Sequence, residues 1–199
     1  MQTFERFLTQ PEERKLFKHV RQFACVLARR DDAWMRLARN TGIRVGAMAG
    51  LTVLDARKAL ASGYLTLRSE IQKRKRAHTM HLNKAAAKAL RDLLKIRREM
   101  GHAEADDAVL IVSRNHRGLS VRSFQARMRQ WSEGAGLPLN VTPHWWRHTL
   151  GMRLMRNSTA QDPRGVVQGV LGHSRVDSTM VYTRPSREDL ANALDEVAA

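Results

Sequence analysis

The stretch that decides the fold is 142–149, which reads Thr-Pro-His-Trp-Trp-Arg-His-Thr. A threonine that can cap a helix stands before a proline, which suits the first helical position, so a helix is predicted to begin here. In that helix His144 and Arg147 are three residues apart and share a face. Taken alone, a His-x-x-Arg pair is equally well explained by an ordinary capped surface helix.

Two more polar side chains follow this helix. The pair 162–163 (Asp-Pro) predicts the start of another helix, and the pair 171–172 (Leu-Gly) predicts its end, so His173 stands just beyond the last turn. Tyr182 is one of two tyrosines in the chain and is predicted on a short helix or turn. Each has an ordinary role as an alternative: a histidine can pair with the helix dipole, and a tyrosine can be a buried aromatic.

Together these four side chains predict a chemistry that none of them has alone. Cleavage of a phosphodiester needs a nucleophile, positive charge for the transition state and a proton donor for the leaving oxygen. A metal would need a cluster of carboxylates, and the sequence shows none. Arginine is suited to the task because its planar guanidinium binds two phosphate oxygens at once and keeps its proton. The sequence therefore predicts a phosphodiester site that uses no metal and no cofactor.

The composition favours a polyanionic partner. The chain has 199 residues, of which 43% are hydrophobic, so it can bury a core. Its 35 Lys and Arg against 19 Asp and Glu give a formal charge of +16, which favours nucleic acid over the alternative of a merely soluble basic surface. Apolar runs are too short to span a membrane, and the N-terminus does not resemble a secretory signal. Cys25 is the only cysteine and is predicted to be a small core residue, so we expect a reduced, cytoplasmic protein with no membrane partner.

The rest of the chain predicts a mainly α fold with a small antiparallel β-sheet, an α+β class, organised as one domain over 1–199. The stretches 64–71 and 78–82 are predicted to form a β-hairpin. Its tip is basic, and no Asn-Gly or Asp-Gly signal marks its turn. Capping residues, apolar periodicity and breakers place helices at 9 to about 29, from 31 to a break at 41–43, from 44 to about 55, at 83–100, at 120–133 and at 186–197, with strands at 64–71 and 78–82.

These stretches resemble the tyrosine recombinase family, also called phage integrases, which share their catalytic core with type IB topoisomerases. The family signature is His-x-x-Arg, then Leu-Gly-His, then a tyrosine nine residues after that histidine, as in this chain. Residues 41–44, Thr-Gly-Ile-Arg, resemble the element that supplies the family's first catalytic arginine. The hairpin at 64–82 resembles the one that carries a catalytic lysine; Lys73 aligns with it, and Lys75 is the alternative.

The resemblance implies a tyrosine recombinase catalytic-domain fold and a recombinase or integrase that joins DNA through a 3′-phosphotyrosine intermediate. The implied catalytic residues are Arg44, Lys73, His144, Arg147, His173 and Tyr182. Candidate DNA contacts are the basic hairpin tip and one helix face, namely Arg74, Lys75, Arg76, Arg122, Gln125 and Arg129. Trp145 and Trp146 are predicted to pack in the core, because duplex DNA offers few free base faces.

The family also implies partners. Double-stranded DNA is the expected substrate, bound by a protein that is a monomer in solution and a tetramer on paired sites, with segment 186–199 docking on a neighbour. Accessory DNA-bending proteins are possible partners, and a bacterial or phage origin with nucleoid association is expected.

The chain departs from the family pattern at three places, one of which is the segment 157–162 between Arg147 and His173, which is slightly longer than usual. Ala47 stands where an acidic residue usually follows the first arginine, and the chain has no room for the N-terminal DNA-clamping domain of most members. It is more similar to the short members that invert fimbrial promoters, although a truncated longer integrase is equally compatible. Two other functions stay open, an inactive DNA-binding regulator with a recombinase fold and a topoisomerase-like enzyme that relaxes DNA without choosing a site.

Overall fold

The computed structural model describes residues 7–72, 75–115, 117–137, 141–173, 179, 182, 195 and 197. It confirms a mostly helical chain with a small antiparallel sheet. The elements are α1 (Gln10–Val20), α2 (Val26–Thr41), α3 (Val45–Ala49), α4 (Val53–Ser62), β1 (Tyr64–Leu67), a 3₁₀ turn (Ser69–Ile71), β2 (His78–His81), α5 (Lys84–Glu99), α6 (Val121–Gly134), α7 (His144–Asn157) and α8 (Pro163–Leu171).

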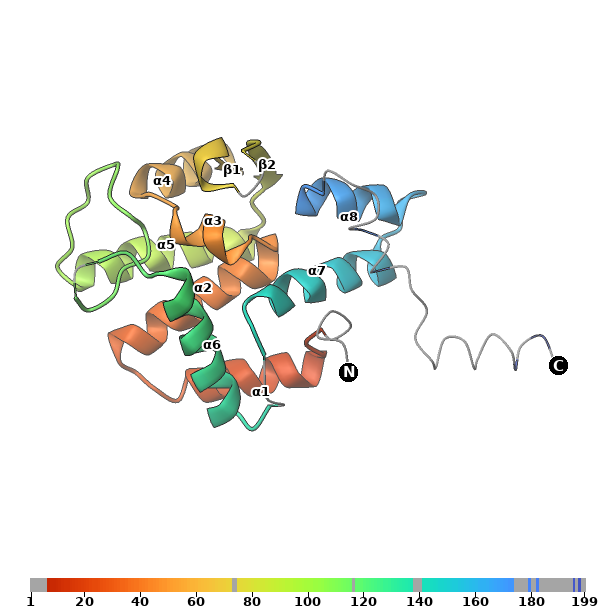
Figure 1. The fold of residues 1–199 in the computed structure, drawn as a ribbon, viewed down its shortest axis with the longest axis horizontal. Helices are drawn as coiled ribbons and strands as arrows, with labels where there is room; N and C mark the ends of the chain where they lie inside the picture. Colours follow the sequence, from red (N-terminus) through yellow and green to blue (C-terminus); the bar gives the residue numbers. More distant parts are fainter. Residues whose placement is uncertain are drawn as a thin grey trace.

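Helix α2 runs through the middle of the molecule (Figure 1) and packs against α5, α7 and α1. Its Trp34 is fully buried and meets Phe124 of α6 edge to face, with ring centroids 5.2 Å apart. Strands β1 and β2 pair antiparallel with Tyr64 opposite His81, and α4 packs on β1. Helices α7 and α8 lie to the right of the other helices in the view of Figure 1.

The first predicted helix is wrong in its length. Its start is confirmed, because Thr9 and Glu12 cap it reciprocally, but α1 ends at Val20 rather than near residue 29. The chain turns there while Phe23 packs on Trp131 of α6, with ring centroids 5.4 Å apart, a distant contact that no local pattern signals. Cys25 is also corrected: it precedes α2 as its N-cap residue and is exposed instead of buried.

The predicted helix start at 31–32 is wrong, since both residues lie inside α2. Asp31 is fully buried and its carboxylate does not cap the helix. One oxygen accepts hydrogen bonds from Arg30 and from the Trp34 Nε1–H. The other accepts from Arg127 at 2.6 Å and from the Trp131 Nε1–H at 2.8 Å, and so joins α2 to α6.

The segment 44–55 and the first strand are shorter than predicted. Helix α3 ends at Ala49, and α4 begins at Val53, whose N–H pairs with the Ala108 carbonyl of a distant loop. Strand β1 ends at Leu67 instead of 71, because Arg68 binds the Asp55 carboxylate and turns the chain into the 3₁₀ segment. Both boundaries are set by tertiary partners.

The remaining predictions are confirmed within a residue or two. Asn83 caps α5 and Ser120 caps α6. Gly42 ends α2 with a φ of 60°, in the left-handed region that favours glycine. Helix α7 begins at His144 with Pro143 as its N-cap, one residue later than the capping pattern indicates. Most of the predicted helix 186–197 lies outside the described residues.

Two apolar clusters form the interior. The main core gathers side chains from α1 to α6 together with Trp145 and Trp146, whose predicted core packing is confirmed. A satellite cluster consists of Val167, Leu171 and Tyr182, against which partly buried side chains of α7 and α8 pack. The two clusters meet along α7.

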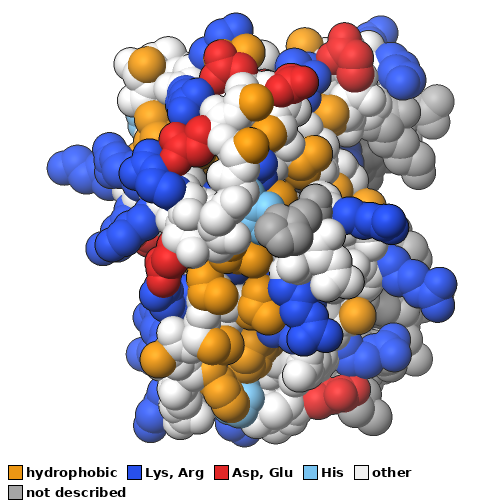
Figure 2. Space-filling model, turned by 90° about the vertical axis from the view of Figure 1, so that its left-hand side faces the viewer, with side chains coloured by type: hydrophobic (Ala, Val, Ile, Leu, Met, Phe, Trp, Pro, Cys, Tyr) orange, Lys and Arg blue, Asp and Glu red, His pale blue; other side chains and the backbone are white. Residues whose placement is uncertain are grey.

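The surface shows how the charge is distributed. On the face in Figure 2, basic side chains are spread around the surface with acidic ones between them, and apolar side chains gather in its lower half. Among the described residues, no helix is long and apolar enough to cross a bilayer.

Candidate active site

Arg147 lies at the centre of the site. It projects from the first turns of α7, is 4% exposed, and donates from Nη1 to the Gly42 carbonyl at 2.9 Å and from Nη2 to the Leu171 carbonyl. It therefore ties the end of α2 to the end of α8. Burial, followed by the charge of Arg44, lowers the pKa of Arg147 to about 10, so it stays protonated at neutral pH.

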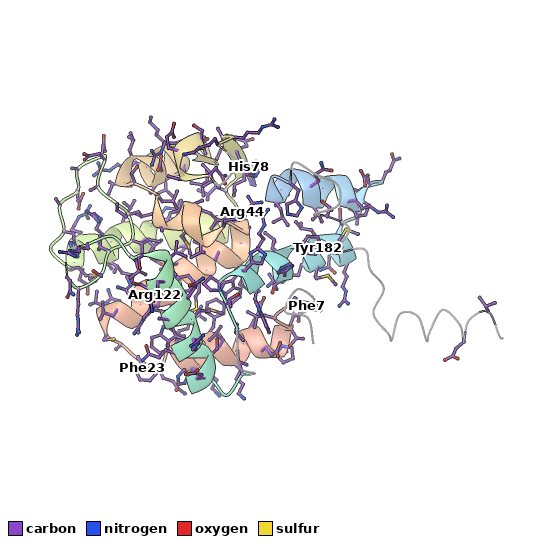
Figure 3. The ribbon with its side chains drawn as sticks, viewed as in Figure 1. Phe7, Phe23, Arg44, His78, Arg122 and Tyr182 are labelled. Carbon is purple, nitrogen blue, oxygen red and sulfur yellow. The ribbon has the colours of Figure 1, made fainter. Side chains whose placement is uncertain are left out.

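Arg44 lies at the start of α3, two residues after the glycine that ends α2. It is half-buried, and Figure 3 shows it at α3 on the side that faces α7 and α8. Arg44 and His144 line an open hollow of about 540 Å³. Ala47, which stands where the family pattern has an acidic residue, lines the same hollow and is buried.

His144 begins α7 and is exposed. Its ring meets that of His148, one turn later, edge to face with centroids 4.6 Å apart. Desolvation by the surrounding protein, and then the positive charges of its neighbours, lower the pKa of His144 to about 4. The imidazole is thus neutral at neutral pH and can donate or accept a hydrogen bond.

His173 follows the end of α8, as predicted. Its ring stacks parallel to that of Tyr182, with centroids 6.1 Å apart and planes 3° apart. Its Nδ1 lies 3.0 Å from the Thr179 hydroxyl. Burial, and then Arg147 and Arg44, lower the pKa of His173 to about 4.

Tyr182 is 6% exposed and sits against α7. A Cβ at Gly151 would lie 2.6 Å from its ring, so only glycine leaves room for the phenol at this point of the helix. Burial raises the pKa of Tyr182, whereas the charges of Arg147 and Arg44 oppose that rise.

The structure therefore brings together five of the six predicted catalytic side chains from four separate parts of the chain. The sixth, Lys73, lies outside the described residues, as does Arg74. Lys75, the alternative, has a positive φ of 52° and lines the hollow beside Arg44 and His144. Arg76 is exposed at the same tip.

The predicted DNA contacts on α6 do not belong to this cluster. Arg122, Gln125 and Arg129 are exposed along one face of α6. Figure 3 shows Arg122 well apart from Tyr182.

Sequence reasoning missed two histidines that lie beside the candidate site. His148 stands four residues after His144, so helical spacing alone could have indicated that it shares the same face. His78 of β2 approaches the end of α8, with its Nε2 3.1 Å from the Val170 carbonyl, and joins the hairpin to the satellite cluster. This second contact depends on the tertiary fold.

The charges in the site suit an anion. The ionisable groups that lower the pKa of His173 are all basic, namely Arg147, Arg44, His148 and His144. No group of three or more metal-ligating side chains occurs in the part of the chain that the structure describes. Two guanidinium groups and neutral imidazoles beside a buried phenol can bind a phosphodiester and supply a nucleophile to it.

Several known proteins are similar to this chain over most of its length. The model of the phage integrase family matches residues 6–189. The tyrosine recombinase XerC of Shewanella amazonensis is 34% identical over 169 residues, which cover 85% of this chain and 53% of that protein. XerC of Azotobacter vinelandii is 34% identical over 173 residues, with the same coverage. The chain thus spans about half the length of these relatives.

Solved structures share the fold. The XerA recombinase matches with a TM-score of 0.73 and 22% identity, over 97% of this chain and 64% of that one. The XerH site-specific recombinase bound to a palindromic difH substrate matches with a TM-score of 0.74 and 17% identity, over 99% of this chain and 54% of that one.

Proposed function

This chain belongs to the phage integrase family, and from that premise we propose that it cuts and rejoins double-stranded DNA at specific sites through a covalent bond to Tyr182. The observation that carries the proposal is the position of this phenol. Its ring faces Gly151 and stacks on His173, and the positive charges of Arg44 and Arg147 lower its pKa against the effect of burial.

The proposed reaction is a transesterification. The Tyr182 oxygen attacks phosphorus, the bond from phosphorus to the 5′-oxygen breaks, and a 3′-phosphotyrosine forms. The phenol loses one proton and the 5′-oxygen gains one, so the step needs no other reactant. Because the ester bond is conserved in the protein–DNA link, a 5′-hydroxyl can reverse the step, and neither ATP nor a metal enters the balance.

The other side chains would stabilise the phosphorane-like transition state. Arg44 and Arg147 would bind its non-bridging oxygens, with His144 and His173 as further donors. Arg147 already has its guanidinium oriented by two carbonyls, so it needs little reorganisation. Lys73 would protonate the leaving 5′-oxygen; Lys75, which lines the hollow, is the alternative.

Partners follow from charge and family. We propose that residues 1–199 act as one catalytic domain on duplex DNA. The side chains of Arg74, Lys75 and Arg76 would contact the DNA phosphate backbone, and the exposed face of α6 with Arg122, Gln125 and Arg129 would make further contacts. Affinity would then fall steeply with salt, because bound phosphates release counterions. Tetramer assembly on paired sites through 186–199, accessory DNA-bending proteins and a cytoplasmic, nucleoid-associated location belong to the same proposal.

The experiment is capture of a covalent adduct. The protein is mixed with a pool of nicked duplexes of randomised sequence, and protein–DNA adducts that survive SDS are isolated and sequenced. We expect adducts with a shared sequence, their loss in Tyr182→Phe, and their retention in Tyr64→Phe, which removes the only other tyrosine.

Other outcomes would contradict the proposal. Binding without any adduct would favour the inactive DNA-binding regulator, and an adduct that survives Tyr182→Phe would exclude this nucleophile. Relaxation of supercoiled DNA independent of sequence would favour the topoisomerase-like activity.

A further inference from the structure

His148 has surroundings that the proposed reaction does not yet use. It follows Arg147 on α7 and is only 8% exposed. Its ring meets that of His144 and also that of Tyr182, the second with centroids 5.7 Å apart and planes tilted by 57°. The His148 ring is therefore in contact both with His144, which we propose to bind phosphate, and with Tyr182, the proposed nucleophile.

The Nε2 atom of His148 is buried and has no hydrogen-bond partner among the described residues. Buried polar atoms are nearly always bonded, so such an exception needs an explanation. Trp146 Nε1 is a second exception, but that ring packs in the main core against Phe17, away from Tyr182. A phenylalanine would fill the place of His148 without an unbonded nitrogen, so packing alone does not account for a histidine there.

His148 is suited to accept a hydrogen bond. Burial, and then the charge of Arg147, lower the pKa of His148, which keeps the ring neutral at neutral pH. A neutral imidazole has one nitrogen that accepts. The His148 ring packs against the Tyr182 ring, and the hydroxyl of Tyr182 can donate a hydrogen bond.

We propose that His148 is the positioning residue of the nucleophile: its ring seats the Tyr182 phenol, and its Nε2 accepts a hydrogen bond from the Tyr182 hydroxyl when that oxygen faces phosphorus. The proposal rests on the proposed function, because it takes Tyr182 as the attacking group. Gly151, one turn after His148, completes the seat from the same face of α7.

The first test needs no DNA. Tyrosine labelled with ¹³C at the carbon that bears the hydroxyl gives two NMR signals, one per tyrosine, and Tyr182→Phe assigns them. We expect the pKa of Tyr182 to fall in His148→Ala, because water enters the seat while Arg147 and Arg44 still attract the phenolate. An unchanged Tyr182 titration would overturn the proposal, whether or not the protein cleaves DNA.

The second test separates positioning from folding. His148→Phe keeps a ring and removes the unbonded nitrogen, so we expect an unchanged or higher melting temperature and unchanged DNA affinity. The rate of adduct formation at saturating DNA should fall about tenfold, the value of one hydrogen bond. His19→Phe is the matched control, since that ring also packs among aromatic side chains, but with Phe23 and Trp131. It should keep the wild-type rate.

The outcomes are distinct. A wild-type rate of adduct formation in His148→Phe would overturn the role of Nε2. Absence of an adduct with the wild-type protein would contradict the proposed function, and the NMR titration would still decide whether His148 seats Tyr182.

Discussion

The main core and the satellite cluster hold the two halves of the site in different ways. Arg44 and His144 stand at the starts of helices that pack into the main core. Tyr182 lies in the small satellite cluster, whose contacts with the rest of the described structure include those of Arg147, Gly151 and His78. The half of the site that we propose to bind phosphate is thus fixed by extensive packing, whereas the position of Tyr182, the proposed nucleophile, depends on contacts that can be removed one at a time.

The largest effect is expected at Arg147, which joins the two regions. Arg147→Ala removes a charge that we propose to bind phosphate, and it leaves the buried carbonyls of Gly42 and Leu171 without this donor. We expect adduct formation to fall about 100- to 1,000-fold and the free energy of unfolding to fall by about 3 kcal/mol. Arg156→Ala, which removes an exposed charge from the same helix, should change the rate by less than about twofold. Equal effects of the two variants would contradict this account.

A smaller effect is expected from Gly151→Ala, which displaces only the nucleophile. The new Cβ would lie 2.6 Å from the Tyr182 ring, and such a displacement should slow adduct formation about 10- to 100-fold. The matched control is Gly169→Ala in α8, where a Cβ meets no atom within 4 Å. It should stabilise the fold by about 0.5–1 kcal/mol and keep the cleavage rate. Unimpaired cleavage by Gly151→Ala would show that Tyr182 is not seated there during the reaction.

A third effect concerns DNA affinity and comes from proton uptake. His144 and His173 have pKa values of about 4, and a bound phosphate should raise them. DNA binding then takes up protons between pH 4 and the raised value, so affinity falls as pH rises through that window, by up to about tenfold per pH unit for each proton. Fluorescence anisotropy at constant ionic strength from pH 5 to 8 measures this slope, and His173→Asn should reduce it. An affinity that rises with pH would contradict the assignment.

The smallest effect on cleavage is expected in the main core. Asp31→Asn leaves Arg30 and Arg127 without their buried counter-charge, so the free energy of unfolding should fall by about 3–5 kcal/mol in urea titrations. Cleavage per folded molecule should stay unchanged, because these contacts lie away from Tyr182. Loss of cleavage without loss of stability would show that the two regions are more tightly coupled than their contacts indicate.

Local chemistry made much of the fold predictable. The capping residues Asn83 and Ser120 marked the starts of α5 and α6, and Gly42 marked the end of α2. The errors lie where distant partners decide: Phe23 on Trp131 ends α1, and Asp31 binds α6 instead of capping a helix.

The residues of the candidate site could be named from the sequence for a different reason. Its residues stand at spacings that the family pattern preserves, so five of them could be named before their contacts were known. Those contacts could not be predicted, because the carbonyls that hold Arg147 and the glycine that faces Tyr182 have no side-chain signal of their own.

The most direct measurement of the central claim is the identity of the residue that carries DNA. After nuclease treatment of the adduct, trypsin releases Tyr64 within 59–68 and Tyr182 within 176–187, so mass spectrometry separates the only two candidates among tyrosines. We predict a nucleotide joined through phosphate to Tyr182. A nucleotide on 59–68, or on a residue other than tyrosine, would contradict the account.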